Sequence, residues 1–154
     1  PNLPIWLDEG LAEYFEIKRG KHGINSPHIY SLSNNMRRSD WRPNLARLEA
    51  LRNPLELDQL DYAESWLWVH FLLSSGEGNQ KFLQNQVKQL IRLGVADPIG
   101  RAVVETIPNC ESNLIAHLEQ LEKKLSQPNS VRPVSVIGSG EDTFCEAFLE
   151  ATWQ

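Results

Sequence analysis

Apolar side chains recur at helical spacing along most of this sequence, beginning with its first turns. Leu7, Leu11, Tyr14 and Phe15 follow one another at i, i+4, i+7 and i+8, which places them on one stripe of a helix. We predict that this helix begins near Pro4, because proline fits the first helical turn, where its missing N–H costs nothing. The stripe is expected to pack against a core.

The most hydrophobic stretch runs from Asp61 to Ser75 and is followed by Gly76, a residue typical of helix ends. Its apolar side chains cover almost the whole circumference of a helix, so we expect a helix that is buried on most sides at the centre of a bundle. The polar stretch 25–43 carries two prolines and is predicted to be a long loop or a partly irregular connection. Apolar spacing and end signals predict further helices at 44–52, 79–93, 97–108 and 109–126.

The composition changes after residue 126. Residues 127–142 hold two prolines, two glycines and three serines, which is typical of a linker, and residues 143–154 are predicted to form a last amphipathic helix or a tail. The predicted fold class is therefore all-α, with one helical bundle over residues 1–126.

Composition and charge narrow the classes of function. The chain has 154 residues, 41% of them hydrophobic and 23% charged, which is typical of a folded domain with a sizeable core. A formal net charge of −5 without a Lys/Arg-rich run disfavours binding to nucleic acid. No apolar run approaches the roughly 18 residues of a membrane span. Cys110 and Cys145 can pair or stay free, so neither the redox state nor the localisation is specified.

Gly10 is unusual inside the first predicted helix, because glycine costs about 1 kcal/mol against alanine there. We expect another part of the chain to approach its backbone closely. The block that contains it, Trp6-Leu7-Asp8-Glu9-Gly10-Leu11-Ala12-Glu13-Tyr14, resembles the W-L-x-E-G-x-A-x-Y element of the gluzincin metallopeptidases, in particular their peptidase-MA-like group. The resemblance implies a helical zinc peptidase subdomain in which Glu9 is the third zinc ligand. It makes Glu13, one turn later, a candidate for supporting the metal ligands by hydrogen bonding.

A second resemblance lies in the predicted central helix. Tyr62-Ala63-Glu64-Ser65-Trp66 and the Val69-His70-Phe71-Leu72 that follows are similar to a helix downstream of the ligand glutamate in the same group. The resemblance implies that Tyr62 donates its phenol O–H to the tetrahedral oxyanion, a catalytic role. The alternative is an anchoring aromatic whose hydroxyl lies at the surface.

The family's H-E-x-x-H motif is not in this sequence. The four histidines are His22, His28, His70 and His117, and no two of them lie at i, i+4. We therefore expect a C-terminal part of a longer zinc metallopeptidase that acts on peptides or proteins, with H-E-x-x-H upstream. This part alone is expected to be inactive and to hold no zinc, and surface normally covered by the missing part is expected to favour self-association.

Other readings of these residues remain open. Helix packing alone would constrain Trp6, Gly10 and Ala12, so the alternative function is a non-catalytic helical domain that binds a protein partner. His28 is interpreted as a solvated loop residue and His70 as a buried residue satisfied by a hydrogen bond. His117 is assigned no chemistry.

Overall fold

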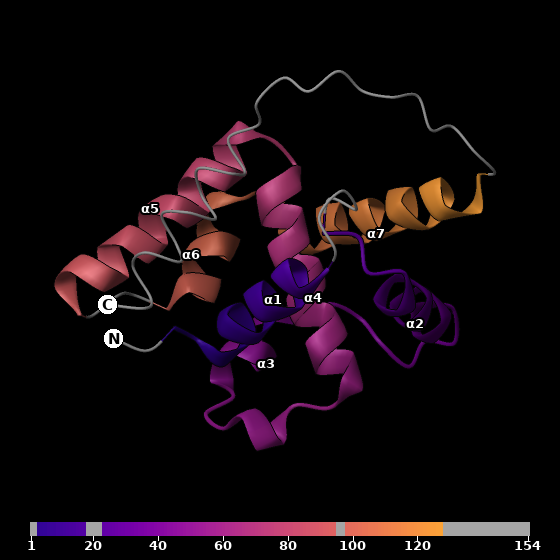
Figure 1. Cartoon of the computed structure of the whole chain (residues 1–154), viewed down its shortest axis with the longest axis horizontal. Helices are drawn as coiled ribbons and strands as arrows, with labels where there is room; N and C mark the ends of the chain where they lie inside the picture. The colour runs from indigo at the N-terminus through magenta and orange to yellow at the C-terminus, as the bar shows by residue number, and fades with distance from the viewer. Residues whose placement is uncertain (1–2, 18–22, 95–97, 128–154) are drawn as a thin grey trace.

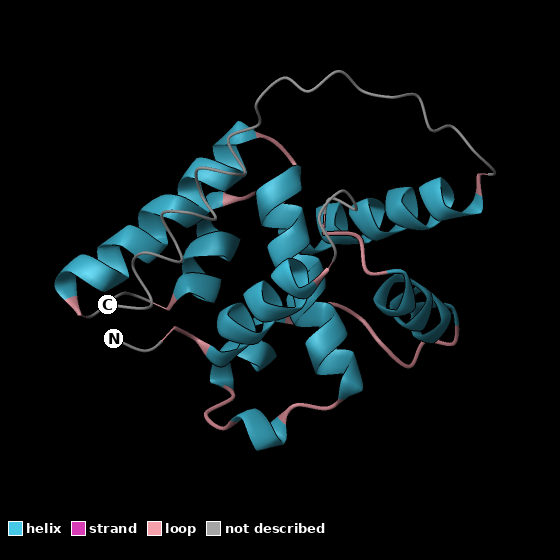
Figure 2. Cartoon of the chain, in the orientation of Figure 1, coloured by secondary structure: helices cyan, strands magenta, loops and turns pink. Residues whose placement is uncertain are grey.

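The computed structural model describes residues 3–17, 23–94 and 98–127. These ranges form helices and connecting loops without a strand, which confirms the all-α fold class (Figure 2). Apart from Gln127, the predicted linker 127–142 and the predicted last helix or tail 143–154 lie outside the described residues. The elements are α1 (Ile5–Glu16), α2 (Ser26–Arg37), α3 (Leu45–Ala50), the 3-10 helix η1 (Pro54–Glu56), α4 (Gln59–Ser74), α5 (Glu77–Leu93), α6 (Ile99–Thr106) and α7 (Cys110–Ser126).

Helix α4 lies at the centre of the bundle, as predicted, and contacts α1, α2, α5 and α7 (Figure 1). It begins at a capping box in which the side chain of Asp58 accepts the backbone N–H of Asp61 and the side chain of Asp61 accepts that of Asp58. Every residue from Ala63 to Leu73 is buried, so this part of the helix has no polar face in contact with water. Its position follows from that composition, because such a helix is stable only when neighbours cover it on most sides.

Helix α1 packs on α4 through Gly10. A Cβ atom added at Gly10 would lie 2.5 Å from the carbonyl oxygen of Ser65 and 2.8 Å from Cγ2 of Val69. This confirms the predicted close approach to the glycine backbone. The prediction that Phe15 shares the buried stripe was wrong, since its side chain is 36% exposed. The buried face turns through Leu7, Gly10 and Tyr14 and leaves Phe15 at its edge.

The stretch 25–43 contains helix α2 and not the predicted loop. Asn25 is the N-cap residue of this helix and its side chain accepts the backbone N–H of His28 at 3.3 Å, and a proline occupies the first turn. Ile29 and Leu32 lie one turn apart and are fully buried. Serine and asparagine make up much of the rest of the segment, so this short apolar stripe is hard to recognise in the sequence. The signal for a helix start, an asparagine N-cap followed by a proline, was nevertheless present.

The remaining predicted helices are present, with shifted ends. Helix α5 begins at Glu77, two residues before the predicted start at 79, and Gly76 occupies its N-cap position. It ends as predicted at Gly94, which adopts the left-handed conformation with φ of 68°. Its buried face consists of Leu83, Val87 and Leu90, and Ile91 lies outside that face with 41% of its surface exposed. Helix α7, predicted over 109–126, buries a stripe formed by Leu114, Leu118 and Leu121.

A fully buried carboxylate, that of Glu64, joins α4 to the segment before and within α3. It accepts hydrogen bonds from the indole N–H groups of Trp41 at 2.9 Å and Trp68 at 3.3 Å, and from the backbone N–H of Asn44 at 2.7 Å. Arg47 lies 3.4 Å away. Burial raises the pKa of Glu64, and these hydrogen bonds and the guanidinium of Arg47 oppose that rise. The cluster fixes where α3 sits on α4.

Candidate functional site

Glu9, the predicted metal ligand, lies in the middle of α1 and is half-buried. Burial raises the pKa of its carboxyl group, and the nearby carboxylates of Asp8, Glu13 and Glu16 raise it further. Within the described part of the chain, the Glu9 side chain makes no hydrogen bond or ion pair. Packing against the described residues therefore gives no role to this carboxylate, in contrast to its neighbour Gly10.

Glu13, the predicted supporting residue, is bound to the start of α2. Its Oε2 atom lies 2.9 Å from Nε2 of His28 and 3.4 Å from Nδ2 of Asn25. The ring centroid of His28 lies 5.7 Å from that of Trp66 on α4. The interpretation of His28 as a solvated loop residue was wrong, because α2 brings it back against α1 and α4. The polar contact of Glu13 thus joins α1 to α2 one turn from Glu9.

Tyr62, the predicted oxyanion donor, lies in the first turn of α4 and is half-buried. It precedes Ser65 by one turn, and the carbonyl of Ser65 lies against Gly10. Glu9 and Tyr62 are therefore each close in sequence to the crossing of α1 and α4. Among the described residues the Tyr62 hydroxyl makes no hydrogen bond, to Glu9 or to any other side chain.

A catalytic zinc requires three protein ligands and an open position for water. In the described ranges no group of three His, Cys, Asp or Glu side chains is arranged to hold a metal ion. Glu9 supplies one carboxylate, so these residues by themselves do not fit a complete zinc site. The same ranges contain no helix long and apolar enough to cross a membrane.

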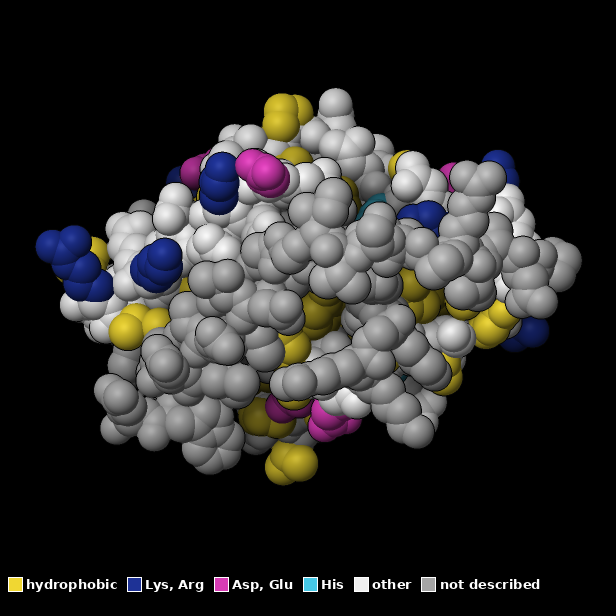
Figure 3. All heavy atoms as spheres, turned by 45° about the horizontal axis from the view of Figure 1, so that its top comes forward, with side chains coloured by type: hydrophobic (Ala, Val, Ile, Leu, Met, Phe, Trp, Pro, Cys, Tyr) yellow, Lys and Arg dark blue, Asp and Glu magenta, His cyan; other side chains and the backbone are white. Residues whose placement is uncertain are grey.

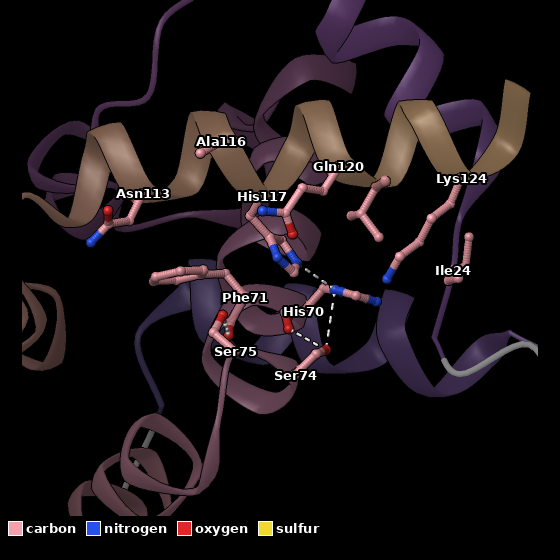
Figure 4. A pocket seen from close by; sticks show the side chains of 11 residues that line it. Ile24, His70, Phe71, Ser74, Ser75, Asn113, Ala116, His117, Gln120 and Lys124 are labelled. Carbon is pink, nitrogen blue, oxygen red and sulfur yellow. Dashed lines mark hydrogen bonds between the residues drawn. The ribbon is translucent and has the colours of Figure 1, made fainter.

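A second group of polar side chains lies in a cavity between α4 and α7 (Figure 4). Nδ1 of His70 and Nε2 of His117 are 2.8 Å apart, and Oγ of Ser74 lies 3.2 Å from the same Nδ1 atom. The prediction that His70 is buried and hydrogen-bonded is confirmed. Burial, aided by the charge of Lys124, lowers the pKa of His117 to about 4. Sequence reasoning missed this pair, because His117 merely adjoins the leucine stripe of α7.

The described surface carries both charged and large apolar side chains. On the face drawn in Figure 3, the Lys and Arg side chains of the described residues lie at separate places. Arg37 on α2 pairs with Glu122 on α7 at 2.9 Å. Cys110 is buried and in no disulfide, and Cys145 lies outside the described residues. Exposed large apolar side chains are spread over several elements, and they are Phe15, Tyr30, Leu55, Ile91, Leu93 and Val104.

No family model, curated protein or solved structure matches this chain. Any assignment of function therefore depends on the residues themselves and on their geometry.

Proposed function

We propose that this chain forms the helical part of a zinc-dependent metallopeptidase in which Glu9 is one of three zinc ligands. The other two ligands would be the histidines of an H-E-x-x-H helix outside this sequence, and the substrates would be peptides or proteins. The proposal rests on a difference between Glu9 and two other residues of the Trp6–Tyr14 block. Trp6 is buried and donates its indole N–H to Glu49, and Gly10 admits the backbone of α4, whereas Glu9 has no structural partner among the described residues.

The electrostatics of Glu9 support a cationic ligand. Burial and three neighbouring carboxylates penalise its charged form, and a bound cation would remove that penalty. A catalytic zinc supplies a water molecule whose pKa is lowered towards neutrality. On the protein side, the tight packing of Gly10 on α4 would hold the Glu9 backbone in place, and the contact of Glu13 with His28 would fix the next turn of α1.

Tyr62 is the proposed oxyanion donor. A phenol O–H is neutral and can be directed at a developing negative charge, and loss of one such donor costs about 2.7–4 kcal/mol of transition-state stabilisation. The absence of another described partner for this hydroxyl leaves it available for that role. Tyr62→Phe in the active protein is therefore expected to lower kcat by about a hundredfold or more while KM changes little.

The decisive experiment measures zinc content and peptidase activity in the longest natural protein that contains this sequence. Glu9→Gln is expected to lower both the affinity for zinc and the activity sharply, because it removes one ligand of three. Glu16→Gln is the matched control, since it removes an exposed carboxylate from the same helix. A parent protein without zinc, or equal behaviour of the two variants, would refute the proposal.

The second candidate function is a non-catalytic helical domain that binds a protein partner. It is favoured by the packing of Trp6 and Gly10, which accounts for most of the motif without any metal. The zinc measurement separates the two candidates, because only the peptidase requires a metal that depends on Glu9.

A further inference from the structure

The cavity between α4 and α7 has a volume of about 640 Å³, within the range of small-molecule binding sites. One face of α7 supplies its polar wall through Asn113, His117, Gln120 and Lys124, which recur at intervals of four, three and four residues (Figure 4). The end of α4 forms the opposite wall, and apolar surface comes from Phe71 among others. The cavity therefore combines hydrogen-bonding groups with a hydrocarbon surface.

The hydrogen bonds at the base of the cavity determine where the ring protons lie. The hydroxyl of Ser74 donates its one proton to the carbonyl oxygen of His70 at 2.6 Å. With that proton placed, the tautomer that satisfies both remaining contacts has Nδ1 of His70 as the donor to Oγ of Ser74 and to Nε2 of His117. Since the pKa of His117 is about 4, its ring is neutral at pH 7 and carries its single proton on Nδ1. His117 thus keeps one N–H that is not used by His70.

The charges around the cavity favour an anion. Among the described residues that line it, Lys124 brings a positive charge, and there is no Asp or Glu. Lys124 makes no ion pair or hydrogen bond within the described ranges. The amide of Gln120 adds further donors, and the amide of Asn113, which donates to the carbonyl oxygen of Pro108 at 3.0 Å, retains its second N–H. A single cation is matched by a monoanion, whereas a phosphate dianion would remain only half compensated.

We propose that this cavity binds a small monocarboxylate with a short apolar group. The carboxylate would accept hydrogen bonds from Lys124 and from Nδ1–H of His117, and the apolar group would lie against Phe71 and Leu121. A free acid and the C-terminal residue of a peptide share this chemistry. The site shares no residue with the proposed zinc ligand or oxyanion donor, so this proposal can be tested and refuted independently of the proposed function.

The test is a titration of the full 154-residue chain, followed by amide resonances in NMR, with N-acetyl-leucine and with N-acetyl-leucinamide. The acid is expected to shift the amides of Ser74, Ser75 and the cavity face of α7 saturably, and the uncharged amide is expected to bind at least tenfold more weakly. The absence of saturable shifts, equal binding of acid and amide, or tighter binding of inorganic phosphate would overturn the proposal. Acetyl-Ala-Ala-Leu distinguishes the sources, because binding as tight as that of N-acetyl-leucine supports a peptide terminus and weaker binding a free acid.

Two variants separate a specific site from general attraction to a cationic helix. Lys124→Gln is expected to weaken binding of N-acetyl-leucine at least fivefold. Lys123→Gln removes the same charge from the next position of α7, which lies outside the cavity lining, and is expected to leave binding unchanged. Equal loss in both variants would refute the site. Thermal unfolding checks that both variants fold, and His117→Gln provides a second probe of the same donor set.

Discussion

Replacing Gly10 by alanine adds a methyl group where the backbone of α4 already lies. The new Cβ atom would be 2.5 Å from the carbonyl oxygen and 2.8 Å from the carbonyl carbon of Ser65. Carbon and oxygen atoms that are not bonded keep close to 3.5 Å apart, and a helix backbone cannot move aside as a flexible side chain can. The substitution therefore forces α1 away from α4 along the most extensive helix contact of the bundle.

The expected loss of stability follows from two opposing terms. Overpacking a tight contact costs about 1–3 kcal/mol or more, and a clash with backbone belongs at the upper end. Alanine regains about 1 kcal/mol of helix propensity over glycine. The net result for Gly10→Ala is a loss of about 2 kcal/mol in the free energy of unfolding, or a melting temperature lower by roughly 8 °C in a domain of this size.

Urea unfolding followed by circular dichroism measures this loss. Gly78→Ala is the matched control, because Gly78 also lies in a helix and an added Cβ there meets no atom within 4 Å. The control is expected to be neutral or up to about 1 kcal/mol more stable. If Gly10→Ala were as stable as the Gly78→Ala control, the close packing of α1 on α4 would be refuted as the reason for this glycine.

Three further predictions concern stability. Glu64→Leu is expected to cost about 2–4 kcal/mol in urea unfolding, because two indole N–H groups and one backbone N–H lose their buried acceptor; an unchanged midpoint would contradict this. The pKa of His117 is about 4 in the folded chain and 6.5 in the unfolded chain, so the unfolded chain binds more protons between these values and stability falls as pH falls from 6.5 to 4. The free energy of unfolding should change by at most about 1.4 kcal/mol per pH unit, and by nearer half of that because the ring is partly exposed. His117→Gln should remove this contribution from the pH dependence of the melting temperature. Arg37→Gln should cost less than about 1 kcal/mol in the same assay despite its pairing with Glu122, because the guanidinium is exposed to solvent.

Local patterns in the sequence were sufficient to predict most of the helices and one packing contact between two of them. The continuous apolar surface of 61–75 required a helix with neighbours on most sides, and α4 occupies that position. The cost of Gly10 within a helix required a close neighbour, which is the backbone at Ser65. Such features can be predicted because the periodicity of apolar residues and the preferences of glycine act within a few residues of the chain.

Tertiary structure decided the features that join distant parts of the chain. His70 and His117 are separated by 47 residues and form a pair only because α7 lies across the end of α4. The contact of Glu13 with His28 depends on α2, whose polar composition masks its apolar stripe. Glu9 was singled out by its motif, whereas its lack of a described partner became visible only once its neighbours were placed. Sequence spacing specifies which face of a helix a residue occupies, but the packing of helices against one another determines which residues that face meets.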